Sequence, residues 1–402
     1  LTAQRAFDLL KKVIPNVKTT ISTLADAAAP DKRAVADHVF TVYGLVARFS
    51  AVLDLATDQA WQQQKEKIPD DLDDAEVDTT VIVCNGTNGV DRTNLIESMN
   101  PEPWAREWND HIPANFVLAM DGYLYMAVGD KGVYGAVGRD GRRVDLHGGG
   151  ILRLRPDGTA LEVFATGMRN ILDVGITDED DLFTYDNTDE KQWMSRVTHM
   201  VERGYYGYPY DFHPRQPWIL WCMADYGAGA ATGVFVDTEG RLPGRFSGNL
   251  FLADFGKRQV TAVRLERSGG TFRAVDPVEL FPDPPADFRP VGICPTVSGT
   301  GFYLCDWQHR DTKEKVTVGR LFRLTHTEPR PVEMEQPPWY RAAAMGIATN
   351  VPITELLGGL EHPARTVRLT AQRQLALRGT EALGALSALL EDPHAAARSR
   401  IH

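Results

Sequence analysis

The chain has 402 residues, of which 43% are hydrophobic and 24% are charged, as in an ordinary globular protein. Its formal net charge of −11 argues against a nucleic-acid partner, which requires a clustered basic surface. No apolar run is long enough for a transmembrane segment and no signal peptide is present, and Leu1 as first residue indicates a fragment or a processed form.

Residues 1–70 are predicted to form a helical segment, because apolar residues recur at helical spacing before Pro15 and again from Val35 to Phe49. The stretch 71–110 begins with acidic residues and is interpreted as a linker or a partial blade. Within it, residues 79–93 are similar to the phosphate loop of cysteine-dependent phosphatases. Gly86 occupies the position of the nucleophile there, so a glycine-rich turn is favoured.

Residues 111–326 are predicted to form a β-propeller, a mainly β fold. A short strand with aromatic residues that ends near an acidic residue occurs four times, and a partner strand follows each copy. A spacing of about 50 to 70 residues between copies is typical of propeller blades rather than of a sandwich. The four copies end at Asp130, Asp186, Asp254 and Asp306.

Residues 327–349 are interpreted as a linker and residues 350–402 as truncated helical repeats. The segment Leu360-Glu-His-Pro363 recurs as Leu390-Glu-Asp-Pro393, which resembles HEAT-type repeats and gives the propeller an α-helical flank. Such repeats serve as interaction scaffolds, so the tail predicts a protein partner. The four cysteines lie far apart, so scattered buried thiols are favoured over a metal or redox site.

Several motifs occur in a fixed order along the predicted propeller. Asp110-His111 precedes a strand that runs into the turn from Gly129 to Gly132. Arg169-Asn170, the segment Tyr185 to Glu190, Gly204-Tyr-Tyr-Gly-Tyr-Pro209 and Asp254-Phe-Gly-Lys257 follow. Over roughly residues 106 to 326, this order resembles the soluble quinoprotein glucose/sorbosone dehydrogenases. It is most similar to the propeller proteins with attached helical repeats that are called membrane-bound dehydrogenases.

The resemblance implies a six-bladed propeller, incomplete here because helices replace its first strands. It also implies an extracytoplasmic protein that oxidises a sugar or polyol with pyrroloquinoline quinone (PQQ) and passes the electrons to an acceptor. Such a reaction requires a base beside the sugar hydroxyl while hydride leaves for the quinone. By resemblance His111 is the base and Asp110 orients it.

The three carboxylates of PQQ require cations, and arginine matches a planar carboxylate well. The resemblance assigns the cofactor to Arg169, Asn170, Lys257 and Arg289. The family also binds calcium through a Gly-Pro segment that this chain lacks. Calcium would therefore need a rebuilt site with the oxygen ligands Asp186, Asn187 and Asp189.

A second hypothesis comes from a different class of protein. The propeller and the helical repeats would form a binding scaffold without catalysis. Convergence of His111, Arg169, Lys257 and Arg289 on one mouth of the propeller would favour the enzyme, and dispersal would favour the scaffold.

Overall fold

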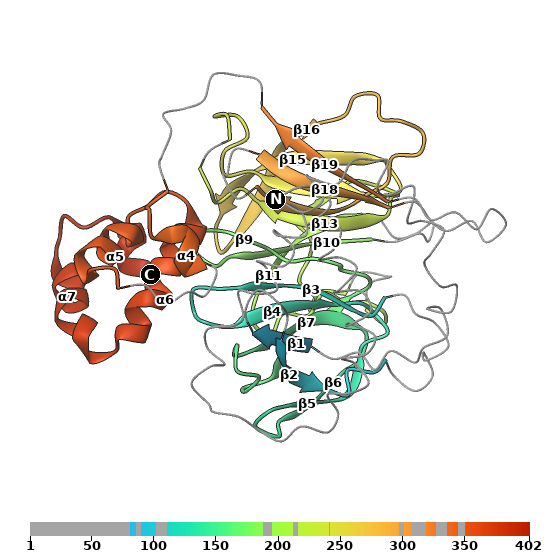
Figure 1. Cartoon of the computed structure of the whole chain (residues 1–402). Helices are drawn as coiled ribbons and strands as arrows, with labels where there is room; N and C mark the ends of the chain where they lie inside the picture. Colours follow the sequence, from blue (N-terminus) through green and yellow to red (C-terminus); the bar gives the residue numbers. More distant parts are fainter. Residues whose placement is uncertain are drawn as a thin grey trace, which may run out of the picture.

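The computed structural model describes a mainly β protein whose antiparallel sheets form a propeller, with helices on one side (Figure 1). The helical segment predicted for residues 1–70 lies outside the described residues. These are residues 81–85, 90–101, 111–187, 195–211, 216–240, 242–296, 301–307, 319–326, 336–344 and 350–402.

The described strands form blades, each a sheet of three or four antiparallel strands. Blade 1 contains β1 (Val81–Asn85), β2 (Val90–Glu97), β5 (Val133–Gly138) and β6 (Arg143–Leu146). Blade 2 contains β3 (Pro113–Leu118), β4 (Leu124–Val128), β7 (Gly149–Leu154) and β8 (Glu162–Met168). Blade 3 contains β9 (Gly175–Ile176), β10 (Leu182–Asp186), β11 (Arg196–Met200) and β12 (Ala224–Asp225). Blade 4 contains β13 (Ala231–Val236), β14 (Leu250–Asp254), β15 (Gln259–Ser268) and β16 (Thr271–Glu279). Blade 5 contains β17 (Pro290–Pro295), β18 (Gly301–Trp307) and β19 (Gly319–Thr325).

Neighbouring blades pack face to face in chain order. Strands β4, β10 and β14 are buried along their whole length, because another blade covers each face. Side chains of a strand alternate between the two faces of its sheet. In β4, Met126 therefore packs into the core shared with blade 1, while Tyr125 and Ala127 pack into the core shared with blade 3.

Four edge strands form the inner wall of the propeller. Strands β3, β9, β13 and β17 each lie at one edge of their sheet, and all four line a central cavity. Each of them pairs antiparallel with the next strand along the chain. The start of each inner strand therefore lies at the same rim as the end of the second strand, which we call the start rim. The opposite rim, formed by the turns between these two strands, is the end rim.

Blade 1 is assembled from two separate segments. Strands β1 and β2 pair with each other as an antiparallel hairpin, and β2 then pairs with β5. The β5–β6 hairpin leaves blade 2 between β4 and β7 and completes blade 1. The stretch 71–110 thus contributes two strands. The predicted glycine-rich turn, residues 86–89, lies outside the described residues.

Helices follow the propeller. They are α4 (Tyr340–Ala344), α5 (Ile353–Leu360), α6 (Arg365–Arg378), α7 (Thr380–Glu391) and α8 (Ala397–Ile401). Helix α5 ends before Pro363 and α7 ends before Pro393, so the two copies of the sequence repeat occupy equivalent helix ends. Helix α4 lies in the stretch that was predicted to be a linker.

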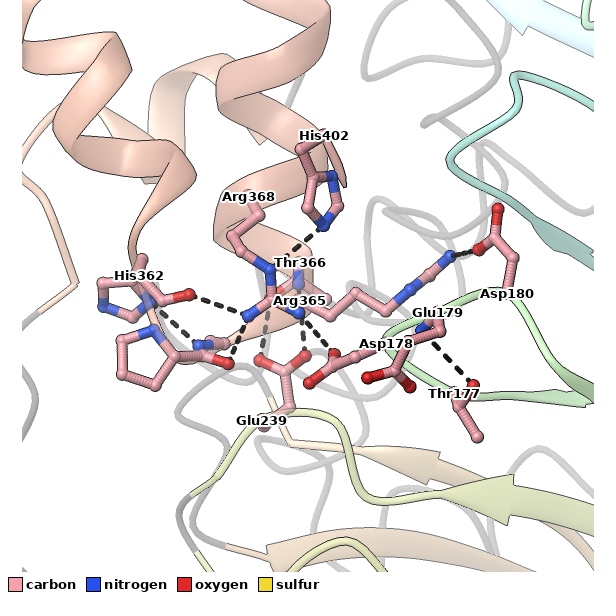
Figure 2. Close-up of polar contacts among 12 residues, drawn as sticks. Thr177, Asp178, Glu179, Asp180, Glu239, His362, Arg365, Thr366, Arg368 and His402 are labelled. Carbon is pink, nitrogen blue, oxygen red and sulfur yellow. Dashed lines mark hydrogen bonds and ion pairs between the residues drawn. The ribbon is translucent and has the colours of Figure 1, made fainter. Parts of the chain in front are cut away.

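Helix α6 docks its first turns onto the end rim (Figure 2). Arg365 forms an ion pair of 2.7 Å with Asp180, in the turn between β9 and β10. Arg368, which is fully buried, pairs with Asp178 of the same turn. Thr366 donates from Oγ1 to Glu239, which follows β13, over 2.8 Å. The described helices therefore cover the end rim.

Candidate functional site at the start rim

A repeated aspartate marks the start rim of blades 2 to 5. In blade 3, Asp186 accepts hydrogen bonds from the backbone amides of Arg169 and Asn170, at 3.1 and 2.7 Å. In blade 5, Asp306 accepts from the backbone amide of Arg289 at 2.6 Å. In blade 4, Asp254 binds the amide of Ala230 at 2.9 Å. The carboxylate thus fixes the chain where it enters the inner strand of the same blade.

An arginine from the start of the third strand neutralises two of these four carboxylates. Arg196 of β11 pairs with Asp186 at 2.8 Å, and both side chains are only 3% exposed. Arg320 of β19 pairs with Asp306 in the same register position. These aspartates are structural, because a buried carboxylate needs a partner and finds one within its own blade.

Blade 2 breaks this pattern. Its aspartate is Asp130, and the register Val128–Gly150 places Gly148 opposite it where blades 3 and 5 have an arginine. The carboxylate instead lies 2.6 Å from Nδ1 of His111, just before β3. Both side chains are 18% exposed, so the pair reaches solvent, unlike the aspartate of blade 3. Asp130 is therefore a start-rim aspartate that pairs with a histidine instead of an arginine.

The backbone beneath this pair is tightly fixed. His111 has φ of 55°, a left-handed conformation that is uncommon for a residue other than glycine. A Cβ atom on Gly129 would lie 2.4 Å from the carbonyl oxygen of His111, so only glycine allows this approach. The turn from Gly129 to Gly132 thus packs closely against the backbone of His111 and fixes the position of its ring.

Tyr208 completes the cluster from the loop after β11. Its hydroxyl donates to the second carboxylate oxygen of Asp130 at 2.8 Å, and its backbone amide donates to Gly167. Two residues after Tyr208, the hydroxyl of Tyr210 lies 2.7 Å from Nε2 of His147, and the two rings stack. The segment from Gly204 to Pro209, noted in the sequence as a motif, therefore forms one wall of the site.

An acid that the sequence did not predict lies beside His111. Asp110, predicted for this role, lies outside the described residues. Asp130 holds His111 instead in the part that is described. The sequence carried a signal for this, because arginine is the first or second residue of the third strands of blades 3 and 5, whereas β7 starts with Gly149-Gly150.

Arg169 and Asn170 lie at the start rim of blade 3. Nη1 of Arg169 donates to Oδ1 of Asn187 at 2.9 Å, and its side chain is largely buried. Oδ1 of Asn170 is buried and has no hydrogen-bond partner among the described residues. A buried acceptor of this kind normally finds a partner, so a ligand or water donor is expected beside it.

Lys257 and Arg289 occupy the start rim of blades 4 and 5. The Lys257 ammonium donates to the carbonyl of Tyr226 and lies 3.8 Å from Asp254. Arg289 donates to the carbonyl oxygens of Ala286 and Phe288 over 3.0 and 2.8 Å. His111 and the four residues predicted to bind the cofactor thus lie at one rim, on blades 2 to 5.

The residues predicted for calcium are engaged within the protein. Asp186 is neutralised by Arg196, and the amide oxygen of Asn187 accepts from Arg169. Asp189 lies outside the described residues. No group of three or more histidine, cysteine or acidic residues in the described part is placed to hold a metal ion. These two residues do not form a calcium cage by themselves, and calcium stays a prediction of the sequence.

Comparisons with known proteins give a family and a set of distant structures. Residues 80–328 match the family described as "Domain of unknown function (DUF7133)". No curated protein matches the chain. Among the described residues, no helix is long and apolar enough to cross a membrane.

Several solved structures of sugar-processing proteins are similar. A glucose dehydrogenase is 15% identical, covers 61% of this chain and 74% of its own, and has a TM-score of 0.46. The PQQ-bound aldose sugar dehydrogenase of Streptomyces coelicolor is 15% identical over 57% of this chain and 82% of its own, with a TM-score of 0.35. The periplasmic gluconolactonase of Pseudomonas aeruginosa is 15% identical over 64% and 65%, also at 0.35. These likenesses are too distant to bear on function.

Proposed function

The chain belongs to the DUF7133 family, and we propose that it is a quinoprotein-type dehydrogenase of a sugar or polyol with His111 as its general base. The observation that carries this proposal is the 2.6 Å contact between His111 and Asp130 at a rim where other blades use their aspartate structurally. An extracytoplasmic location and an external electron acceptor belong to the same proposal by family resemblance.

The contact with Asp130 favours the tautomer of His111 that a general base requires. A carboxylate can only accept hydrogen bonds, so Nδ1 of His111 carries the proton that it shares with Asp130. The basic lone pair is then on Nε2, which is left to take the proton of a substrate hydroxyl. Tyr208 holds the other oxygen of Asp130 and so prevents the carboxylate from rotating away.

The charges at the start rim suit PQQ, whose three carboxylates require cations. Lys257 and Arg289 would bind carboxylates there, and Arg169 would add a third positive charge from a more buried position. The unsatisfied acceptor of Asn170 would take a hydrogen bond from the cofactor. When bound, PQQ supplies the acceptor for the hydride that leaves the carbon carrying the hydroxyl.

Reconstitution tests the proposal. The protein is titrated with PQQ, with and without calcium, and dye reduction is followed with a panel of sugars and polyols. We expect saturable PQQ binding and turnover that falls about 100-fold in His111→Gln, the usual contribution of a positioned base. His147→Gln, a histidine at the neighbouring turn, is the matched control and should retain turnover.

A specific observation favours a second function, a binding scaffold without catalysis. The side chains of Arg169 and Lys257 already donate to Asn187 and to the carbonyl of Tyr226, so part of the cationic rim serves the fold. Under this alternative the helical segment carries the partner. Absence of PQQ binding in the titration would favour the scaffold, as would PQQ binding with no turnover on any substrate.

A further inference from the structure

A partly open cavity lies at the centre of the propeller, towards the end rim. The cavity has a volume of about 240 Å³ and is walled by the inner strands β3, β9, β13 and β17. Arg365, Thr366 and Leu369 of α6 form its floor at the end rim. A cavity of about 150 Å³ is already large enough to take up benzene when its walls are apolar.

Most of the wall is apolar. Aliphatic side chains from three blades and from α6 face the cavity, and the set includes Val174, Ile176, Val234, Val236, Ile293 and Leu369. Water gains few hydrogen bonds against such a surface, so an apolar molecule of suitable size displaces it favourably.

The floor carries a donor that the protein leaves unused. Arg365 is only 5% exposed, and its terminal nitrogens donate to Asp180 and to the carbonyl of Leu118. Its Nε atom is buried and has no hydrogen-bond partner among the described residues. Because Asp180 already balances the guanidinium charge, the best hydrogen-bond acceptor for this N–H is a neutral oxygen rather than a second anion.

A second polar group lies on the wall. Asp173 accepts hydrogen bonds from Nδ2 of Asn115 at 2.9 Å and from the backbone amides of Val174 and Val234 at 2.9 and 3.3 Å. Burial raises the pKa of its carboxyl to about 7. Asp173 and Glu239 both line the cavity and would repel an anionic ligand.

We propose that the central cavity binds a small neutral molecule with an apolar body and one carbonyl oxygen, which accepts the hydrogen bond from Nε of Arg365. The apolar walls hold the body, and the unused N–H fixes its orientation. This site is at the opposite end of the inner strands from His111, and it does not depend on the proposed dehydrogenase activity.

The test uses 4-fluoroacetophenone as a probe, a neutral ketone with a fluorine atom for ¹⁹F NMR. We expect saturable binding to the full chain. 4-Fluorobenzoate, an anion of similar size, should bind at least tenfold more weakly. Absence of saturable ketone binding overturns the proposal, and equal binding of the benzoate overturns the ligand class.

Two variants locate the site. Leu369→Trp fills the cavity from its floor and should abolish binding, whereas Leu377→Trp changes an exposed residue of the same helix and should not. Arg365→Lys keeps the positive charge for Asp180 but removes Nε, so we expect binding at least tenfold weaker. Unchanged binding in folded Leu369→Trp, or in Arg365→Lys if the first variant does not fold, would overturn the location.

Discussion

One residue type, aspartate at the start rim, has two roles in this propeller. Asp186 and Asp306 hold the entry of an inner strand and are neutralised by an arginine of their own blade. Asp130 has no such arginine and holds His111 instead. The difference lies at the start of the third strand of each blade. Strand β7 begins with glycine there, whereas arginine is the first residue of β11 and the second residue of β19.

This division of roles predicts different stability effects. Asp186→Asn leaves the buried Arg196 without its counter-charge and should lower the free energy of unfolding by about 3 to 5 kcal/mol. Asp130→Asn, at a partly exposed pair, should cost about 1 kcal/mol. Urea denaturation of both variants measures this. An equally large loss in Asp130→Asn would mean that the His111 pair is structural too.

Asp173 predicts a pH dependence of stability. Burial raises its pKa from 3.8 to about 7, so the native state holds the proton more tightly than the unfolded chain does. The resulting stabilisation is complete below about pH 4 and is lost as the pH rises to about 7. Each pKa unit corresponds to about 1.4 kcal/mol.

The measurement is the difference in unfolding free energy between the wild type and Asp173→Asn at several pH values. This difference should move in favour of the variant by a few kcal/mol between pH 4 and pH 8, since asparagine does not titrate. Taking the difference removes the effects of other acids, such as Asp237, whose pKa burial also raises. A difference that stays constant with pH would show that Asp173 is not the titrating group.

At the scale of elements, the sequence predicts the second strands best. Strands β4, β10, β14 and β18 are aromatic-rich and mostly buried on both faces, so they stand out as a repeat. The inner strand β9 has only two residues, too few for any periodicity. The sequence did not predict the β5–β6 hairpin as part of blade 1 either, because its pairing with β2 depends on tertiary packing and not on a local sequence pattern.

The candidate site shows the same limit. The sequence names His111 and the cationic residues through motif order, but Asp130 and Tyr208 come together from positions 78 residues apart. The docking of α6 depends on ion pairs between residues that are 185 and 190 positions apart in the sequence. No local pattern encodes such contacts.

Buried Arg368 links α6 to the end rim through Asp178, which leads to a third prediction. Arg368 also donates to Nε2 of His402 and to the carbonyl oxygens of His362 and Pro363. Arg368→Ala should lower the unfolding free energy of the protein by about 2 kcal/mol or more, because several acceptors and Asp178 lose their donor together. Thermal or urea denaturation checks this.

Arg341→Ala, at an exposed arginine of α4, is the matched control and should change stability by less than about 0.5 kcal/mol. Equal effects in the two arginine variants would indicate that α6 is held by its apolar contacts alone.

At the scale of the whole molecule, the propeller separates two surfaces. The start rim carries His111 and the cationic residues, and the end rim carries the helical segment (Figure 1). The rigid blades between them are joined by buried cores that run from blade to blade. In the part of the chain that the structure describes, these packed cores connect one rim to the other.

The last prediction tests this separation by hydrogen–deuterium exchange. In Arg368→Ala the turns beneath α6, near residues 119–123, 177–181 and 237–240, should exchange faster, because local opening follows the loss of local contacts. The amides just inside the starts of β3, β13 and β17 should keep their wild-type rates, since the hydrogen bonds of these strands to β4, β14 and β18 are unchanged. Faster exchange at both rims would mean that the helical segment stabilises the propeller as one cooperative unit. In that case a partner bound to the helices could also influence the site around His111.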